Sequence, residues 1–598
     1  MKEDQSPVWQ LDLVELLASL IPHNEVACVL RLVSKATAAH FQTAEYITVR
    51  MSQLVPHHAF VRRWGDARAL RRLTWRQRRQ LLKLTARSGS LVNLEALLAF
   101  EEYCPLLPFI LEAAAGAGHL AICQALRERG CPFRGEALDK AAGGGHRATC
   151  EWLLACGCPW SRYAPGCAAA GGHAELADWL MISRHRQPED DDDDEDDVCN
   201  LIRGAAKGCD MEAMQRLFSM WVKGGQEEEG NEEEEGGEGD EEAEPRQRRT
   251  LSRSDEKSIL GAAVRSLTSD WQAKVEYLEA RGFKKQLEVW IAANLVGCAD
   301  WAARLEWLRQ RGYLMADADL VNAMAKHAAY SGNAAALATL LQQALPGHTV
   351  QAVLENAAEA GHVHILDLLA AQGVLPPNDG GDNGGLFRAF KVAVREGHVA
   401  AADWLAQALG PEALGQRIAE VTEYDNVTLE LLIMLHGLGW PLCEEMFSYA
   451  AASGSKEALE WLAEHGCPMP TDGGPYTEPA CKGDLSTLNF LRRLGCPVSD
   501  STHLFRGILY GYHLYGCGPR PIGLAWLLEN GFRVDLEHVG YIDELEPEVL
   551  DWLRDDHQRR QMSSGSCGAA APDAAAAAPD AAAAEQQRQQ QDVVAGVS

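Results

Sequence analysis

Cysteine and histidine side chains gather between residues 146 and 173, where their chemistry invites a metal site. The set is Cys150, Cys156, Cys158 and Cys167, with His146 and His173 nearby. Thiolates and imidazoles are the ligands that Zn²⁺ prefers in proteins. Their spacing matches none of the usual zinc patterns, and Cys158 occupies a position that recurs elsewhere in the chain. We therefore expect no metal and no cofactor here.

Histidine also recurs directly after glycine along the chain. The recurring residues are His119, His146, His173, His362 and His398. None stands in a nucleophile motif, and the sequence holds no phosphate loop ending in Gly-Lys-Ser/Thr, no Gly-x-Ser-x-Gly elbow and no His-Glu-x-x-His helix. We expect these histidines to cap or pack at turns and to border a partner surface, and we expect no catalysis.

Residues 62–87 hold nine arginines and one lysine against one acid, Asp66. Trp64 and Trp75 are interleaved with them. Such a segment is typical of nucleic-acid binding or nuclear import, but it is also typical of a solvated helix face, held against acidic parts of the same chain. We favour the solvated face, because the rest of the chain is acidic and repels phosphate. Nucleic acid is therefore not among the expected partners.

The net charge of −30 is concentrated in two segments. Residues 189–197 contribute nine acids and residues 227–244 twelve, so −30 + 21 leaves −9 for the remainder. Seventeen cysteines without a signal peptide favour free thiols in a reducing compartment, the cytoplasm or the nucleus. No uncharged apolar run reaches the roughly 18–20 residues that a bilayer requires.

The elements that position these residues follow from a repeated phrase. Glycine, an aromatic residue seven positions later and a second glycine twelve positions later recur from Gly145, Gly454 and Gly483. Further copies begin at Gly118 and Gly172, and others are spread through the chain, including degenerate copies near Gly89 and Gly208. A fixed period of this kind predicts an all-α solenoid of stacked helix pairs.

Each repeat predicts two helices. An alanine-rich helix comes first and allows close approach, glycine then ends it, and a second helix carries a bulky aromatic residue followed by leucine. The aromatic residues are expected to fill the layer between repeats: Trp152, Trp179, Trp404, Trp461 and Phe490. A closing glycine followed by proline ends the second helix.

Composition divides the chain into eight segments. These are a helical module (1–50), a basic helical linker (51–84), repeats (85–187), an acidic insert (188–197), a degenerate repeat (198–225), an acidic and basic insert (226–256), further repeats (257–560) and an alanine- and glutamine-rich tail (561–598). We expect the two inserts and the tail to be disordered. Residues 376–385, rich in glycine and asparagine, are expected to be a further flexible insertion.

The phrase resembles the second-helix signature of ankyrin repeats, best seen from Gly361-His362 to Leu368-Leu369 and Gly373. The resemblance covers roughly residues 85–535 outside the inserts. It lacks the Thr-Pro-Leu-His opening, and Gly-Cys-Pro-Trp replaces the usual Gly-Ala-Asp. The period of 27–29 residues implies a shortened or missing hairpin finger, so partner contacts would come from the inner helix faces and from inserted loops.

Residues 8–41 resemble an F-box, whose family docks on the Skp-type adaptor of a cullin ubiquitin ligase. Leu13, Leu16, Leu17 and Leu20 form one helical stripe, Pro22 opens a turn, and Asn24 is positioned to cap a second helix. Val26, Val29, Leu30 and Val33 are expected on the buried side of that helix. The residues expected to shape the docking module are Leu13, Leu16, Leu20, Pro22, Val26 and Val33.

Three functions remain open at this stage. The first is a monomeric adaptor, in which the repeats hold a client protein and the N-terminal module binds a Skp-type adaptor. The second is a scaffold without a ubiquitin role, with residues 8–41 acting only as a helical cap of the array. The third is a phosphodiesterase, because divergent arrays of this kind are grouped with neutral sphingomyelin phosphodiesterases, although no residue supports that chemistry.

Overall fold

The computed structural model describes residues 11–185, 194–222, 249–313, 318–342, 345–376, 384–411, 414, 427–498, 504–505, 508, 522–532 and 553–554. The chain divides into one unit of residues 1–540 and another of residues 541–598. Of the second unit only residues 553 and 554 are described. The tail apart from the ranges above, residues 188–193 and 226–248 of the two inserts, and most of residues 376–385 lie outside the described residues.

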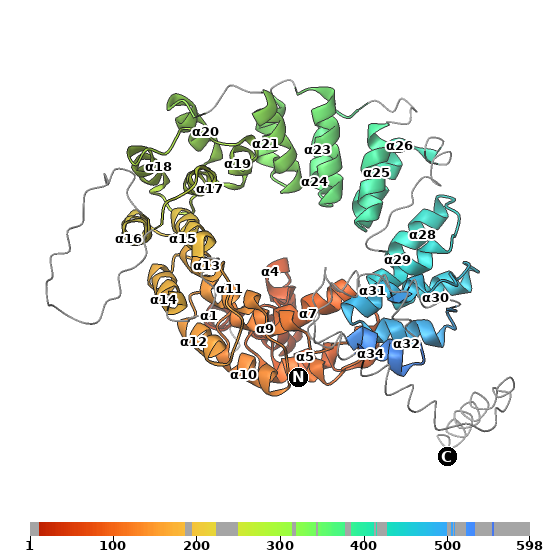
Figure 1. Cartoon of the computed structure of the whole chain (residues 1–598). Coiled ribbons are helices and arrows are strands. Elements are labelled where there is room, and N and C mark those ends of the chain that lie inside the picture. Colours follow the sequence, from red (N-terminus) through yellow and green to blue (C-terminus); the bar gives the residue numbers. More distant parts are fainter. Residues whose placement is uncertain are drawn as a thin grey trace, which may run out of the picture. The chain divides into compact units, whose positions relative to one another are not determined.

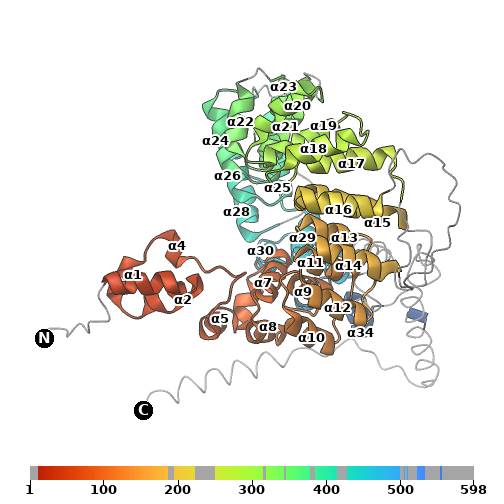
Figure 2. The ribbon, with the colours of Figure 1, turned by 90° about the vertical axis from the view of Figure 1, so that its left-hand side faces the viewer.

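A small helical module begins the described chain (Figure 2). It consists of α1 (Leu11–Leu20), α2 (His23–Cys28), the 3₁₀ turn η2 (Leu30–Leu32), α3 (Lys35–His40) and α4 (Ala44–Ile47). Its own core is formed by Val14, Val26, Leu30 and Phe41. Two short helices, α5 (His57–Trp64) and α6 (Ala67–Arg71), lead from it into the repeats.

Successive helix pairs form the rest of unit 1 (Figure 1). The first five pairs are α7 (Trp75–Arg87) with α8 (Leu91–Leu98), α9 (Pro108–Ala115) with α10 (Leu120–Glu128), α11 (Gly135–Gly143) with α12 (Arg147–Ala155), α13 (Ala164–Ala170) with α14 (Ala174–His185), and α15 (Asp194–Gly208) with α16 (Met211–Trp221). First helices pack on first helices from α7 to α17, which makes the chain a helical-repeat solenoid.

The pattern continues through the second half of the unit. The helices are α17 (Arg253–Val264), α18 (Trp271–Ala280), α19 (Val289–Ala293), η3 (Asn294–Gly297), α20 (Trp301–Gln310), α21 (Ala318–Tyr330), α22 (Ala334–Leu341), α23 (Gly347–Glu359), α24 (Val363–Ala371), α25 (Gly385–Arg395), α26 (Val399–Leu409), α28 (Leu429–Gly437), α29 (Glu445–Ser453), α30 (Lys456–Glu464), α31 (Gly474–Lys482), α32 (Leu485–Arg493) and α34 (Ile522–Glu529). The described residues contain isolated bridges but no strand. None of their helices is long and apolar enough to cross a membrane.

Alanine and leucine fill the core between the repeats. The alanines of the first helices, such as Ala114 and Ala141, are fully buried and allow these helices to approach each other. On the second helices the buried residue is the leucine after the aromatic residue, as at Leu153 and Leu462. The array therefore buries a small residue from one helix and a leucine from the other in each repeat.

Glycine serves two different purposes in this array. Gly118 and Gly145 have φ of +75° and +76°, which favours glycine at the turn between paired helices. Gly208 was expected to mark such a turn, but it lies in the last turn of α15. A Cβ there would lie 2.0 Å from the carbonyl oxygen of Ala170. This glycine therefore permits the close packing of α15 on α13.

Both acidic inserts are shorter than the sequence predicts. Residues 194–197 belong to α15, and Asp197 is buried 4.0 Å from Arg184. Acidic residues stabilise a helix N-terminus through the helix dipole, which explains why this part of the charge run is helical. At the second insert, Ser252 caps α17 through a capping box with Asp255, so residues 253–256 are ordered.

Candidate functional site

The N-terminal module presents apolar side chains to solvent. Ten of the seventeen exposed large apolar residues in the described chain lie between residues 13 and 54, so the exposure is concentrated there. They are Leu13, Leu16, Leu17, Leu20, Val29, Leu32, Val33, Ile47, Val49 and Leu54. Leu16 is 56% exposed and Leu20 73%. Apolar residues gathered in this way mark an interaction surface.

The structure exposes five of the six predicted docking residues and buries the sixth. Leu13, Leu16, Leu20, Pro22 and Val33 are exposed, whereas Val26 is buried in the module core. The expectation that Val29 and Val33 are buried is wrong. Residues 30–32 form a 3₁₀ turn instead of continuing the helix, and this change of geometry turns both valines outward.

Asn24 has a different role from the predicted cap. The first helical residue of α2 follows Pro22, and no side chain caps this helix. The Asn24 amide nitrogen donates to the carbonyl oxygens of Arg50, at 2.8 Å, and Leu54, at 3.0 Å. Its amide oxygen accepts from the Arg50 backbone N–H at 2.8 Å. Asn24 therefore fixes residues 50–54 against the module, which the sequence pattern did not indicate.

The recurring histidines connect neighbouring repeats. The Nε2 atoms of His119, His362 and His398 lie 3.0, 3.1 and 3.0 Å from backbone carbonyl oxygens of the preceding repeat. These carbonyls belong to Arg87, Tyr330 and Glu359. An imidazole N–H that donates to such a carbonyl satisfies a group left open at a helix end.

Each histidine ring also covers the turn glycine of the repeat before it. A Cβ at Gly118 would lie 2.4 Å from His146 Nδ1, and one at Gly145 would lie 2.4 Å from His173 Cε1. Burial lowers the pKa of His146, which favours its neutral form. The five histidines are half-buried at these joints, so only their edges remain available to a partner.

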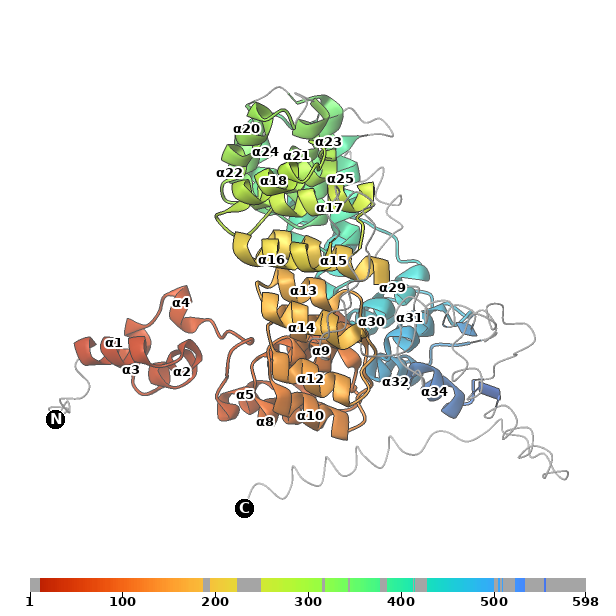
Figure 3. The same cartoon turned by 60° about the vertical axis from the view of Figure 1, so that its left-hand side comes forward.

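Four of the five predicted aromatic residues lie at the border of the packed layer, and the fifth, Phe490, is buried as expected. Trp152, Trp179, Trp404 and Trp461 are half-buried, and Phe490 is 7% exposed. The Trp404 indole N–H donates to Asp367 of the preceding repeat at 2.8 Å. The leucine that follows each aromatic residue fills the layer between repeats. The wider indole extends beyond this layer to the second helix of the neighbouring repeat. Figure 3 shows such second helices, α10, α12 and α14, following one another.

Two hollows open along the repeats. One of about 580 Å³ is lined by charged side chains of both signs, such as Arg147, Glu175 and Asp210, together with His173 and small residues. Another of about 450 Å³ is lined by residues of α19, α21 and α23. Trp290 and Tyr330 line this second hollow and are 59% and 51% exposed. Exposed aromatic residues are common anchors in protein interfaces.

Buried ionic groups join segments that are distant in sequence. Arg78 of α7 donates to both carboxylate oxygens of Asp484, which caps α32, at 2.9 and 2.7 Å. Ser486 accepts from Arg78 at 2.7 Å and from Lys456 at 2.8 Å. Burial alone would raise the pKa of Asp484, but the charge and hydrogen bonds of Arg78 hold it well below its usual range.

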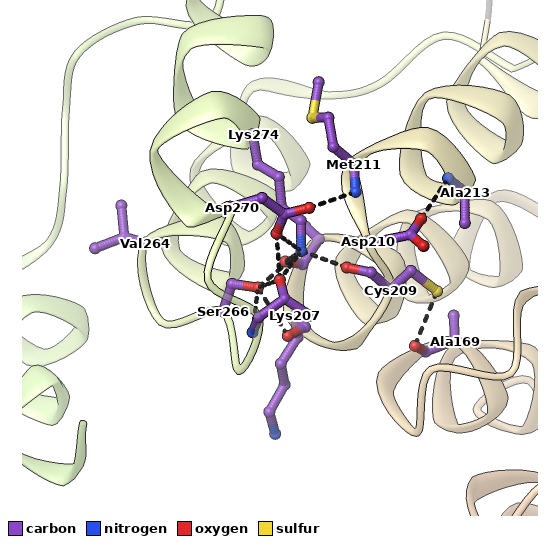
Figure 4. A network of polar contacts seen from close by, with 12 residues as sticks. Ala169, Lys207, Cys209, Asp210, Met211, Ala213, Val264, Ser266, Asp270 and Lys274 are labelled. Atoms are coloured by element: carbon purple, nitrogen blue, oxygen red, sulfur yellow. Dashed lines mark hydrogen bonds and ion pairs between the residues drawn. The ribbon is translucent and has the colours of Figure 1, made fainter. Parts of the chain in front are cut away.

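Lys274 forms a second buried network (Figure 4). Its ammonium group donates to Ser266 at 2.8 Å and Thr268 at 2.6 Å, and it also contacts the carbonyl oxygen of Cys209. These contacts join α15 to the segment between α17 and α18. Burial lowers the pKa of Lys274, and Asp270, 3.4 Å away, opposes that effect.

The cysteines of the repeats pack and donate weak hydrogen bonds. The thiol of Cys158 donates to the Arg134 carbonyl at 3.4 Å, and that of Cys467 to the Cys443 carbonyl at 3.1 Å. Burial raises the pKa of Cys158 to about 12. The fifteen cysteines of the described residues are free, and no cluster of potential metal ligands occurs among those residues.

No protein-family model matches this chain, and none of the curated proteins matches it. Among solved structures it is similar to the pentatricopeptide repeat protein PPR10 in complex with an 18-nt psaJ RNA element, at 13% sequence identity and a TM-score of 0.24 over 93% of this chain and 92% of that one. A cysteine-to-serine variant of that protein, with the same RNA element, gives the same values.

These comparisons correct one prediction. Both solved structures are complexes with RNA. The prediction that nucleic acid is not a partner is therefore wrong as an exclusion, because it rested only on the acidic charge of the whole chain. The basic segment within residues 62–87 has to be judged from its own geometry.

Proposed function

We propose that this protein is a monomeric, non-catalytic recruiter. The ankyrin-like repeats would bind a client protein, while the F-box-like module of α1–α4 would dock on a Skp-type adaptor of a cullin ubiquitin ligase. The observation that carries the proposal is the set of exposed leucines and valines on this module. A module that served only as a cap would be expected to bury them.

The client side of the proposal is supported by the hollow that α19, α21 and α23 line. Trp290 and Tyr330 can bury apolar surface of a client, while Lys326 and Glu359 in the same hollow provide charges of both signs. Two of the half-buried turn histidines, His362 and His398, lie next to the carbonyl oxygens of Tyr330 and Glu359 and would border this contact. A scaffold without a ubiquitin role would bind a client through the same hollow, but its helices α1–α4 would not dock on a Skp-type adaptor.

Binding of the full chain to a purified Skp-type adaptor tests the proposal. We expect Leu16→Glu/Leu20→Glu to abolish binding, because both side chains are exposed and a charge there opposes an apolar contact. Leu267→Glu is the matched control, since Leu267 is 74% exposed on the array. Absence of adaptor binding by the unchanged protein would leave the scaffold as the better description.

A further inference from the structure

One face of α7 carries a row of cations, while the opposite face of this helix packs into the core of the array. Arg76, Arg79, Lys83 and Arg87 recur at intervals of three and four residues, with Gln80 among them, so they lie on a single side of the helix. The three arginines are exposed and Lys83 is half-exposed. From Arg76 to Arg87 the row extends about 16 Å along the helix. We call these five residues the α7 basic face.

This face differs from three neighbouring arginines, whose charges are paired with carboxylates. Arg71 and Arg72 pair with Glu460 and Glu457, and Arg78 is buried against Asp484. Within the described residues, no carboxylate lies at ion-pair distance from any cation of the α7 basic face. The expected pairing of this segment with acidic parts of the same chain occurs at Arg71 and Arg72, whereas the α7 basic face has no such acidic counterpart among the described residues.

The surroundings of the row are also mainly basic. Lys140 of α11 lies close enough to Lys83 for the two ammonium charges to repel, which, after burial and Arg79, helps to lower the pKa of Lys83. Glu112 of α9 acts on Lys83 in the opposite sense, and burial, followed by the charge of Glu136, raises the pKa of its own carboxyl group. Two cations, Arg79 and Lys140, and one partly buried acid, Glu112, thus act on Lys83, which leaves a local positive potential on an acidic chain.

Arg79 and Lys83 are positioned by an aromatic ring. The guanidinium carbon of Arg79 lies 4.8 Å from the ring centroid of Phe109, and the Lys83 ammonium lies 5.6 Å from it. The ring supports one side of the Arg79 guanidinium group. Because this residue is exposed, its other side remains accessible, and a guanidinium plane can stack on a nucleobase while donating to phosphate.

We propose that the α7 basic face binds the phosphodiester backbone of single-stranded nucleic acid. A single row of cations matches a single row of phosphates, whereas a duplex presents phosphates on two strands. Three of the four cations are arginines, whose forked donors match phosphate oxygens and whose planes can stack on bases. An acidic peptide would use the charges but not the accessible side of Arg79. This binding is a further function, separate from client recruitment.

The charge count fixes the expected salt dependence. For single strands, the logarithm of the association constant falls with the logarithm of salt concentration by about 0.7 per neutralised phosphate. Four cations therefore give a slope of about −3 for the full-length protein. Binding of a labelled uridine oligonucleotide, measured by fluorescence anisotropy between about 50 and 200 mM salt, provides this slope.

Charge reversal on the face provides the decisive comparison. Arg79→Glu/Lys83→Glu should weaken uridine-oligonucleotide binding at least about tenfold and reduce the slope by about 1.4, because two phosphate contacts are lost. The milder Arg79→Gln/Lys83→Gln variant should shift both values in the same direction. The matched control is Lys284→Glu/Arg309→Glu, which changes one lysine and one arginine that are exposed on other repeats. We expect it to bind like the unchanged protein.

Three results would overturn the proposal. They are no oligonucleotide binding at low salt, binding that the α7 variants leave unchanged, and tighter binding of a duplex or of a polyglutamate peptide than of the uridine oligonucleotide. A thymidine oligodeoxynucleotide separates RNA from DNA as the source of the phosphates. Comparable binding of both single strands supports recognition of the backbone, and preference for the uridine strand supports RNA through its 2′-hydroxyl groups.

Discussion

At the scale of single residues, the glycine at each turn and the histidine of the next repeat form a matched pair. Gly118 has a positive φ, and its missing side chain leaves room for the His146 ring. Gly130 has a similar φ of +86°, but a Cβ there would meet nothing within 4 Å. The two positions therefore separate the cost of backbone strain from the cost of a lost inter-repeat contact.

We predict that Gly118→Ala destabilises the array more than Gly130→Ala does. Both substitutions place alanine in the left-handed region, at roughly 1–2 kcal/mol. Gly118→Ala also forces the Cβ against His146, which adds about 1–3 kcal/mol as overpacking does in other cores. Thermal unfolding of the two variants measures how much more stability Gly118→Ala loses than Gly130→Ala. Combining Gly118→Ala with His146→Ala should remove most of this extra loss, because the ring that the Cβ meets is then absent. An equal loss in both single variants would contradict the pairing.

The sequence allowed the turns and repeats to be predicted, but not these partners. Periodicity places Gly118 and His146 in register, yet it contains no distance between one repeat and the next. Asn24 was assigned to a cap because asparagine commonly caps helices, whereas its partners lie 26 to 30 residues further along the chain. Asp484 occupies the repeat position that holds histidine elsewhere, and this change of residue was the available signal of a special contact.

At the scale of elements, Lys456 shows how the last repeats depend on pH. It begins α30, is 2% exposed, and lies 4.5 Å from the centre of the Tyr103 ring. Burial, followed by repulsion from Arg78, lowers the pKa of Lys456 to about 7, although Asp484 and Glu102 oppose this shift and Arg71 adds to it. The unfolded chain keeps this lysine protonated up to its ordinary value of 10.5.

We predict that the contribution of Lys456 to stability increases with pH between about 7 and 10.5. In this range the unfolded state binds a proton that the native state has released, so the free energy of unfolding rises with pH. The melting temperature of the unchanged protein should therefore rise relative to that of Lys456→Met over this range. A constant difference between the two proteins would show that Lys456 keeps its proton in the folded chain.

Element boundaries show a further limit of the sequence. The acids at residues 194–197 and the segment 253–256 were assigned to inserts from charge alone. Local capping by Ser252 and the favourable helix dipole outweigh that charge, so both segments form first turns of helices. Composition predicted where the inserts are, whereas the start of each helix is decided by hydrogen bonds at its first turn.

At the scale of the whole molecule, Arg78 and Asp484 connect the first repeats to the last. In a solenoid each repeat contacts only its neighbours, so perturbations remain local. Here the carboxylate of Asp484, which caps α32, pairs with the guanidinium group of Arg78, 406 residues away in the sequence. Arg71 with Glu460 and Arg493 with Glu102 extend the contact on either side. The backbone amides near both ends of the array should therefore gain and lose protection against hydrogen exchange together.

We predict that Asp484→Leu raises amide hydrogen exchange in α7 and α9 as well as in α32. Removing one member of a buried ion pair typically costs about 3–5 kcal/mol, because the other charge remains buried without its partner. The double variant Arg78→Met/Asp484→Leu should recover part of this loss, since no buried charge is then left alone.

Arg311→Met is the control for this experiment, because Arg311 pairs with Glu279 and Glu276 on a neighbouring repeat. Its effect should remain within α18 and α20. If Asp484→Leu likewise changed exchange only in α31, α32 and α34, the two ends would behave as independent repeats and the contact would carry no coupling. Exchange that rises in α7 while α21 and α23 stay unchanged is the pattern that only a direct link between the first and last repeats produces.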